Sequence, residues 1–207
     1  MSTVIANQPT ILLDNHADPS VSASLVRLMI KQSKGGQGRG DLELNNWGTK
    51  NNALGYLYFD DPRFSSGKTV QVRVGQQVLL DGQISEIDPH FPAGMPPTLS
   101  LVVLMNQPAG SSAPVGPVSR LSYGNELFEF GVKETWLAER GPALSREIRY
   151  LSGQGTASFA GHWMPGLKVD LEGLGARYSG AYTLVEVVHT WDSAAGLRTQ
   201  FTAERIE

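Results

Sequence analysis

The side chains of this sequence that could carry chemistry are few and scattered. His189, Trp191 and Asp192 stand together near the C-terminus, in the run VVHTWDSAAG. The 4 histidines show no H-x-x-x-H or H-E-x-x-H spacing, so a metal site would need ligands from distant strands. Asp192 can bond the amides of a hairpin loop over 192–196, and His189 needs only one hydrogen-bond partner. We interpret the cluster as the end of a hairpin.

Two stretches look like phosphate-binding loops but lack the rest of the motif. SSGKT, at 65–69, has Pro62 where a P-loop needs glycine, and the strand-like VQVRV follows it. SKGGQGRGD, at 33–41, contains no G-x-G-x-x-G and lies between two expected strands. We interpret 33–41 as a long mobile hairpin loop that orders against an acidic partner surface. Its candidate assembly residues are Lys34, Gly35, Gly36, Gln37, Gly38 and Arg39.

Hydrolase motifs are also missing from the sequence. No G-x-S-x-G occurs, and GTASFAG, at 155–161, spaces its glycines too widely around Ser158. Acid pairs such as Asp60/Asp61 and Glu126/Glu129 resemble glycosidase carboxylates, but such pairs are expected by chance among 20 acidic residues. We predict no catalytic residue, no cofactor and no metal.

The composition favours a globular β protein. The chain has 207 residues, of which 41% are hydrophobic and 18% charged, with 23 glycines and 12 prolines. Such a chain can bury a core, and its frequent turn residues favour short strands. A formal charge of −3 with mixed signs offers no field for direct nucleic-acid binding. The absence of cysteine fits folding in a reducing compartment, and we expect synthesis in the bacterial cytoplasm without stable membrane insertion.

Alternation and β-branched content predict strands on both sides of a linker. NQPAGSSAPVGPVS, at 106–119, is rich in proline, glycine and serine and separates a domain at 1–105 from one at 120–207. Two short helices are expected, at 50–59 and 134–146. Because short strands bury neither face alone, we expect two tandem small β-barrels with these helices at their ends. The expected strands are 24–32, 41–45, 68–74, 83–87, 98–105, 127–133, 147–151, 167–171, 181–191 and 197–206.

A similar pattern occurs in each half of the chain. GKTVQVRV, at 67–74, leads to DGQISEI at 81–87, much as GLKVDLEG at 166–173 leads to SGAYTLVEV at 179–187. In each copy a glycine opens an alternating strand and a second glycine, Gly82 or Gly180, precedes the next strand. The sequence thus suggests an internal duplication. Within 182–191, alternation places Thr183, Val185, Val187, His189 and Trp191 on one face.

The C-terminal fifty or so residues resemble the late-control protein D family, the baseplate hub proteins of contractile-tailed phages and related injection systems. The matching elements are Gly155 to Gly161, the G-L-G-A-R-Y-S-G-A-Y run at 173–182, V-x-H at 187–189 and G-L-R-T-x-F at 196–201. A softer likeness covers LELNNWG at 42–48 and YLYFDDPRF at 56–64. The family-signature residues are Gly82, Gly166, Gly180, Tyr182, His189, Trp191, Asp192 and Gly196.

The resemblance implies a fold and an assembly. Each subunit of the family holds two barrels similar to the tail-tube protein, and three subunits form a ring of six barrels. This chain would then be a structural baseplate protein, a homotrimer that joins a sixfold tail tube to a trimeric spike, with other baseplate components as further partners. Its place would be the baseplate of a virion or an injection particle.

The chain departs from the family in one respect. The short linker at 106–119 stands where members carry a largely helical insertion, and the spike must be a separate chain. Two other functions stay open at this point. One is a tandem-barrel module that binds carbohydrate or single-stranded nucleic acid, and the other is a peptidoglycan hydrolase that uses carboxylates.

Overall fold

The structure is a computed structural model that describes residues 8–50, 52–106, 119–140 and 145–207. It is mainly β, as predicted, and its described residues form two compact units. The first unit holds the described residues of 8–31, 37–106 and 189–197. The second holds those of 32–36, 119–188 and 198–207.

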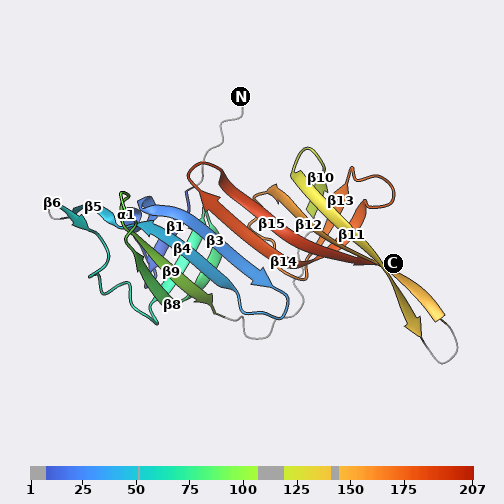
Figure 1. Cartoon of the computed structure of the whole chain (residues 1–207), viewed down its shortest axis with the longest axis horizontal. Helices are drawn as coiled ribbons and strands as arrows, with labels where there is room; N and C mark the ends of the chain where they lie inside the picture. The colour runs from blue at the N-terminus through green and yellow to red at the C-terminus, as the bar shows by residue number, and fades with distance from the viewer. Residues whose placement is uncertain (1–7, 51, 107–118, 141–144) are drawn as a thin grey trace. The chain divides into compact units, whose positions relative to one another are not determined.

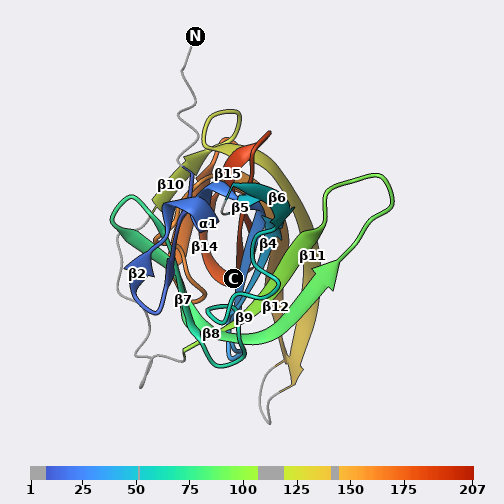
Figure 2. The same ribbon diagram turned by 90° about the vertical axis from the view of Figure 1, so that its left-hand side faces the viewer.

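The first unit is built on a sheet with the strand order β3-β4-β9-β8-β7-β1-β2, in which every neighbouring pair is antiparallel. Figure 2 shows β7, β8, β9 and β4 following one another around a strongly curved surface. A separate hairpin, β5–β6, is inserted after β4, and a short helix, α1, precedes β3. The elements are β1 Thr10–Leu13, β2 His16–Ala17, α1 Pro19–Ala23, β3 Leu25–Ser33, β4 Arg39–Asn45, β5 Trp47–Lys50, β6 Ala53–Tyr56, β7 Thr69–Val74, β8 Gln77–His90 and β9 Thr98–Met105.

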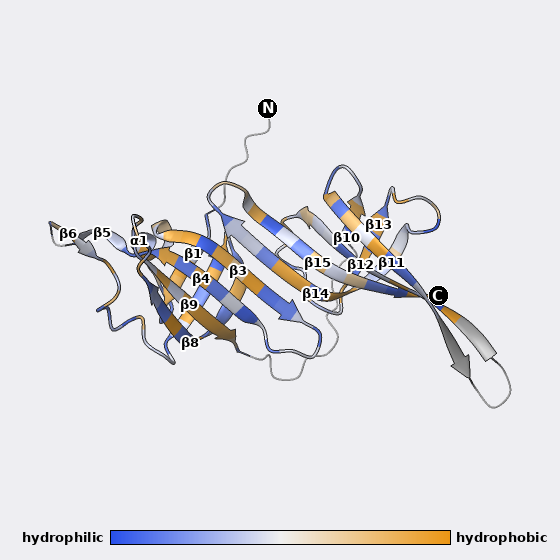
Figure 3. Ribbon diagram, viewed as in Figure 1, coloured by the Kyte–Doolittle hydropathy of each residue, from blue (hydrophilic) through white to orange (hydrophobic). Residues whose placement is uncertain are grey.

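Alternation fixes which face of this sheet is buried. In β4 the side chains of Leu42 and Leu44 are buried, whereas Asp41, Glu43 and Asn45 between and beside them face outward. Figure 3 shows this alternation of hydrophobic and hydrophilic residues along β3 and β4. The core consists mainly of aliphatic side chains, among them Ile11, Leu28, Ile30, Val70, Val72, Leu80, Ile84, Leu99, Leu101 and Val103.

The second unit has the strand order β11-β12-β15-β14-β13-β10. Its neighbouring strands are antiparallel where β11, β12 and β15 meet and where β13 meets β14, but β10 is parallel to β13. The β11–β12 pair continues beyond the residues that pair β12 with β15 (Figure 1). The strands are β10 Ser119–Ser122, β11 Leu127–Arg140, β12 Ser145–Ser158, β13 Lys168–Glu172, β14 Gly180–Asp192 and β15 Gly196–Ile206.

Aromatic rings fill much of the second core. Trp163, Tyr182 and Phe201 are buried, and Phe130 packs beside them at 5.5 Å from the Tyr182 ring centroid. Glycine in β12 makes room for these rings, because a Cβ at Gly155 would lie 2.6 Å from the Phe201 ring. The other buried members are Leu121, Leu127, Leu151, Ala157, Leu167, Val169, Leu171, Leu184, Val187 and Ala203.

All of the strands expected from the sequence are present, and several are longer than expected. The two predicted helices are wrong. Residues 53–56 form β6, where Asn52, at φ +63°, supports a tight turn back from β5. Residues 134–140 continue β11 in unbroken register with β12, so cross-strand pairing overrides the helical appearance of ETWLAER. The single helix described is α1, which begins after the cap residue Asp18.

The predicted linker at 106–119 lies outside the described residues apart from its two ends. Asn106 donates its amide to Asp81 O at 3.0 Å, and Ser119 begins β10. The domain boundaries at 105 and 120 stay a prediction. Closure of each unit into a barrel likewise stays a prediction.

Candidate assembly sites

The residues around 33–41 form a shorter turn than the sequence predicts. Ser33 ends β3 and Arg39 begins β4, so only 34–38 connect the strands, and the expected long loop is wrong. Lys34 donates its amide to Val185 O at 2.9 Å, and Gly35 sits at φ +74°, a conformation that favours glycine. Arg39 is already paired within the chain, because its Nη2 donates to Asp41 Oδ1 at 2.7 Å.

The His189, Trp191 and Asp192 cluster is the end of the β14–β15 hairpin, as the sequence predicts. Asp192 Oδ1 accepts from the amides of Ala194 and Ala195, at 2.8 and 2.6 Å. His189 and Trp191 are buried. Asp192 therefore closes the turn, and His189 and Trp191, which share a face, are part of the buried end of the strand.

The expected face assignment in β14 is wrong for the first part of the strand. Tyr182 and Leu184 are buried and Thr183 and Val185 are only partly buried, whereas Val187, His189 and Trp191 are buried, so the five residues expected on one face do not share it. One extra residue therefore enters the alternation between Leu184 and Val187, as it does at a β-bulge. A bulge cannot be read from side-chain type alone, so alternation carried through the whole strand gives the wrong phase.

The two halves share one turn-and-hairpin motif, and its hydrogen bonds repeat. The Gly67 amide donates to Ile84 O at 2.8 Å, and the Gly166 amide donates to Leu184 O at 2.7 Å. In return the amides of Ile84 and Leu184 donate to the carbonyls of Lys68 and Leu167. Both glycines have positive φ, +85° and +96°. This agreement shows that the sequence likeness reflects the same local structure twice.

The turn before each hairpin repeats as well. Phe64 N donates to Asp61 O in the first unit, and Trp163 N donates to Ala160 O in the second. Both aromatic side chains are buried, Phe64 at 7% and Trp163 at 2% exposure. The predicted equivalence of Gly82 and Gly180 is wrong, because the strand registers place Gly82 opposite Val70 and Tyr182 opposite Val169.

The signature glycines serve close approaches of the chain. A Cβ at Gly82 would lie 2.2 Å from the Leu104 carbonyl oxygen of the neighbouring strand. A Cβ at Gly180 would lie 2.6 Å from Arg205 Nη1, which donates to Ser179 O. Gly196 opens β15 with φ +69°. Glycine at these positions therefore allows a neighbouring strand or arginine side chain to lie close, or lets the backbone adopt positive φ.

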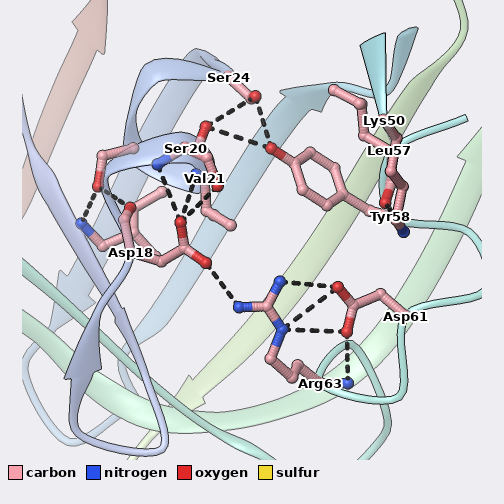
Figure 4. Close-up of polar contacts among 11 residues, drawn as sticks. Asp18, Ser20, Val21, Ser24, Lys50, Leu57, Tyr58, Asp61 and Arg63 are labelled. Atoms are coloured by element: carbon pink, nitrogen blue, oxygen red, sulfur yellow. Dashed lines mark hydrogen bonds and ion pairs between the residues drawn. The ribbon is translucent and has the colours of Figure 1, made fainter. Parts of the chain in front are cut away.

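In the first unit, Arg63 joins the helix cap to the turn after β6 (Figure 4). Its Nη1 lies 2.6 Å from Asp18 Oδ2, and its Nη2 lies 2.7 Å from Asp61 Oδ2. Burial acts to raise the pKa of Asp18, but hydrogen bonds from Ser20, Val21 and Arg63 lower it from 3.8 to about 2. The pKa of Asp61 is lowered chiefly by its hydrogen bonds from Arg63.

A second charged network, the arginine cluster, lies in the second unit and comprises Arg149, Arg177 and Arg205 with Glu134 and Glu207. Arg149 Nε donates to Glu134 Oε1 at 2.9 Å, and Arg177 Nε donates to Glu134 Oε2 at 3.1 Å. These hydrogen bonds, with that from Arg177 the strongest, lower the pKa of Glu134. Arg205 pairs with Glu207. The network ties β11, β12, β15 and the turn before β14 together.

Sequence reasoning missed the arginine cluster because its members are far apart in the chain. Only the run at 173–182, already notable for its glycines, carries a signal, since it contains Arg177, Tyr178 and Tyr182. Arg177 stacks on Tyr178 with 5.6 Å to the ring centroid, and Arg205 lies 5.8 Å from that of Tyr182.

Among the described residues, no group of three or more histidine, aspartate or glutamate side chains is arranged to hold a metal ion. The acid pairs considered above have other neighbours, because Asp61 is held by Arg63 and Glu126 accepts from the Ser122 amide. Within the same part of the chain, no helix is long and apolar enough to cross a membrane.

Comparison with known proteins shows the fold. No protein-family model matches the sequence, and no curated protein matches it. The tail protein from Neisseria meningitidis MC58 matches 96% of this chain over 96% of its own, with a TM-score of 0.64 and 10% identity. The 43 kDa tail protein of prophage MuSo2 from Shewanella oneidensis matches 95% of this chain over 97% of its own, with a TM-score of 0.65 and 10% identity.

A third similar structure belongs to a secretion system. The E. coli c3393 protein, a component of the type VI secretion system with structural similarity to T4 bacteriophage tail proteins, matches 87% of this chain over 73% of its own. Its TM-score is 0.51 and its identity 8%. The chain thus has the fold of phage tail proteins and of a related secretion component, which confirms the structural part of the resemblance seen in the sequence.

Proposed function

We propose that this chain is a structural baseplate hub protein of a contractile phage tail or a related injection system. The observation that carries the proposal is the duplicated unit: one strand order and one turn-and-hairpin motif occur twice in a chain whose fold matches tail proteins. Two similar units in one chain let three chains present six similar units.

The proposed assembly is a homotrimeric ring with pseudo-sixfold symmetry. Its units alternate around the ring, so each contact is between the first unit of one chain and the second unit of the next. Such a ring contacts a sixfold tail tube on one side and a separate threefold spike on the other, with other baseplate components around it. The location of the protein is then the baseplate of a virion or an injection particle.

Support for a structural rather than an enzymatic role comes from the described sites. The charged clusters consist of arginine–carboxylate pairs that connect neighbouring elements, and the solved structures that it resembles are tail proteins. An assembly protein needs rigid loops and interfaces, and these networks provide rigid loops.

Native mass spectrometry over a range of concentrations tests the proposal. We expect a species of three chains, each of 22.4 kDa, that persists on dilution, because permanent interfaces commonly bury more than about 2,000 Å². A monomer at every concentration contradicts the ring, and a hexamer indicates a tube-like assembly instead.

A further inference from the structure

An exposed apolar surface lies on the first unit, beside the inserted hairpin. We call it the aromatic groove, and it is formed by β5, β6 and the loop between β8 and β9. The rings of Trp47 and Tyr56 meet edge to face with 5.5 Å between their centroids, and the ring centroid of Phe91 lies 6.0 Å from that of Tyr56. Its lining residues are Trp47, Tyr56, Phe91, Pro92, Gly94, Met95, Pro96 and Pro97.

The groove is exposed and carries no charged side chain among its lining residues. Phe91 is 60% and Met95 66% exposed, and Tyr56 is 48% exposed. Contiguous apolar surface of this kind on a folded unit marks an interaction site more often than a solvent face. Aromatic rings with proline and methionine suit an extended, uncharged segment of another protein.

The walls of the groove are held in place from below by Asn46, which is fully buried. The backbone N–H of Asn46 donates to Pro97 O at 2.9 Å, and its side-chain Oδ1 accepts from the backbone amides of Leu57 and Tyr58. Lys50 Nζ donates to Leu57 O at 2.7 Å, which fastens the other end of the hairpin. Because the walls are already ordered, binding would lose little conformational entropy.

The groove occurs in only one of the two duplicated units. At the corresponding places of the second unit, β12 leads to the turn before Trp163 without an inserted hairpin, and Asp192 closes a short turn between β14 and β15. In the proposed ring, features common to both units repeat six times, whereas the groove repeats three times. Symmetry therefore matches the groove to a threefold partner.

We infer that the aromatic groove is the docking site for the threefold partner of the ring, which inserts an uncharged, apolar, extended segment from each of its three subunits. The inference rests on the proposed function. It commits to a separate protein rather than a second copy of this chain, because the groove occurs once in each chain and its three copies in the ring match the three subunits of a threefold partner.

The test uses a displayed library of random dodecapeptides selected on the full-length protein. The Phe91→Ser and Met95→Ser variants remove exposed side chains and should leave folding intact. Val78→Ser, which removes an exposed side chain of the same unit away from the groove, is the matched control. We expect uncharged apolar sequences to be enriched, and a synthetic peptide of the leading sequence to bind one per chain.

We expect this peptide to bind at least tenfold more weakly to the two groove variants and unchanged to the control. Charged sequences, no enrichment, or equal binding to the groove variants overturns the inference. Native mass spectrometry of the same variants gives a second readout. Dissociation of the trimer by Phe91→Ser identifies a second copy as the occupant and also overturns it.

The two levels of the proposal fail in different ways. A stable wild-type trimer without selective peptide binding contradicts the groove assignment and leaves the hub proposal in place. A wild-type chain that never forms a trimer contradicts the hub proposal, and the threefold docking site with it.

Discussion

The two units of this chain have the same framework and different additions. Both order their strands alike, β3-β4-β9-β8-β7-β1 in the first and β11-β12-β15-β14-β13-β10 in the second. Both place a positive-φ glycine and a buried aromatic residue in the turn that enters the hairpin. The shared parts are those that pair strands and fill cores, so duplication has kept what each unit needs to fold.

The differences lie at the ends and edges of the sheets. Strand β1, next to the end of its sheet, is antiparallel to β7, whereas its counterpart β10 is parallel to β13. The first unit adds the β5–β6 hairpin, and the second lengthens β11 and β12. Changes at edges leave the core pairing intact, and edges are where sheets meet partners. The comparison shows that the two units share a framework and differ in the elements added to it.

The largest expected effect comes from the buried aromatic residues of the duplicated turns. Trp163→Ala should lower the free energy of unfolding by about 3–5 kcal/mol, since it empties a fully packed site and removes the bond from Nε1 to Ser119 Oγ. Phe64→Ala should have a slightly smaller effect because it breaks no hydrogen bond. Urea denaturation measures both, with the exposed Trp136→Ala as control. A loss of free energy of unfolding below about 1 kcal/mol for either variant would show that its aromatic residue is not a core site.

The next largest effect is a pH dependence of the free energy of unfolding, which arises from the charged network around Asp18. The folded pKa of Asp18 is about 2 and its usual value is 3.8, so ionised Asp18 stabilises the fold above pH 3.8. This contribution, about 2 kcal/mol, is lost as the pH falls toward 2. Asp18→Asn keeps a helix cap but not the charge. We expect the gap in unfolding free energy between wild type and variant to shrink between pH 5 and 2, and a constant gap would contradict the assigned pairing.

In the second unit the corresponding change is Glu134→Gln. The neutral amide cannot pair with both Arg149 and Arg177, and the Glu134 side chain is only 13% exposed. We expect urea denaturation to show a lower free energy of unfolding for this variant, because it loses the charge that both arginines pair with. The exposed Glu129→Gln in the same strand is the matched control. Equal results for the two variants would mean that the arginine cluster does not hold the unit together.

The glycines that open the hairpins should show smaller and nearly equal effects. Gly67 and Gly166 have φ of +85° and +96°, and alanine in that region costs about 1–2 kcal/mol. No atom lies within 4 Å of a Cβ built at Gly67, so its cost arises from the backbone. Gly55→Ala and Gly131→Ala, at open positions without positive φ, are the controls. Thermal unfolding of all four variants would reveal whether the duplicated turns are equivalent in energy.

The smallest effect on stability is expected at the turn 34–38. Lys34→Ala combined with Arg39→Ala removes only exposed charge, and exposed ion pairs contribute about 0.2–1 kcal/mol. Folding should therefore be nearly unchanged. If this turn contacts a neighbouring chain, the trimer should dissociate at a higher protein concentration than wild type. A dilution series by native mass spectrometry that matches wild type would remove the turn from the candidate assembly sites.

Sequence patterns predicted the strands well because each strand has its own alternation of apolar and polar residues. They failed where tertiary pairing decides. The run ETWLAER predicts a helix but continues a strand. The β1–β2 hairpin was also missed, although its turn residues Asp14 and Asn15 are of the types that tolerate the positive φ they adopt there. The change in the phase of burial between Leu184 and Val187 of β14 was invisible for the same reason. Register is a property of two strands, and one strand alone does not carry it.

The candidate sites divide in the same way. Asp192 was predicted to bond its loop amides because that interaction is local in sequence. The Arg63 network and the arginine cluster join residues from distant segments, so no spacing rule finds them. The aromatic groove was visible only in part, as the dense aromatic run at 56–59, since Phe91 and Met95 come from another loop.

Cryo-electron microscopy of the purified oligomer tests the central claim most directly. The account predicts top views of a ring made of three chains, with six similar densities that alternate between two kinds and a threefold set of added features. A particle with a single chain, or a ring in which three chains give three rather than six similar densities, would contradict the claim that the duplicated units stand as equivalents in the assembly.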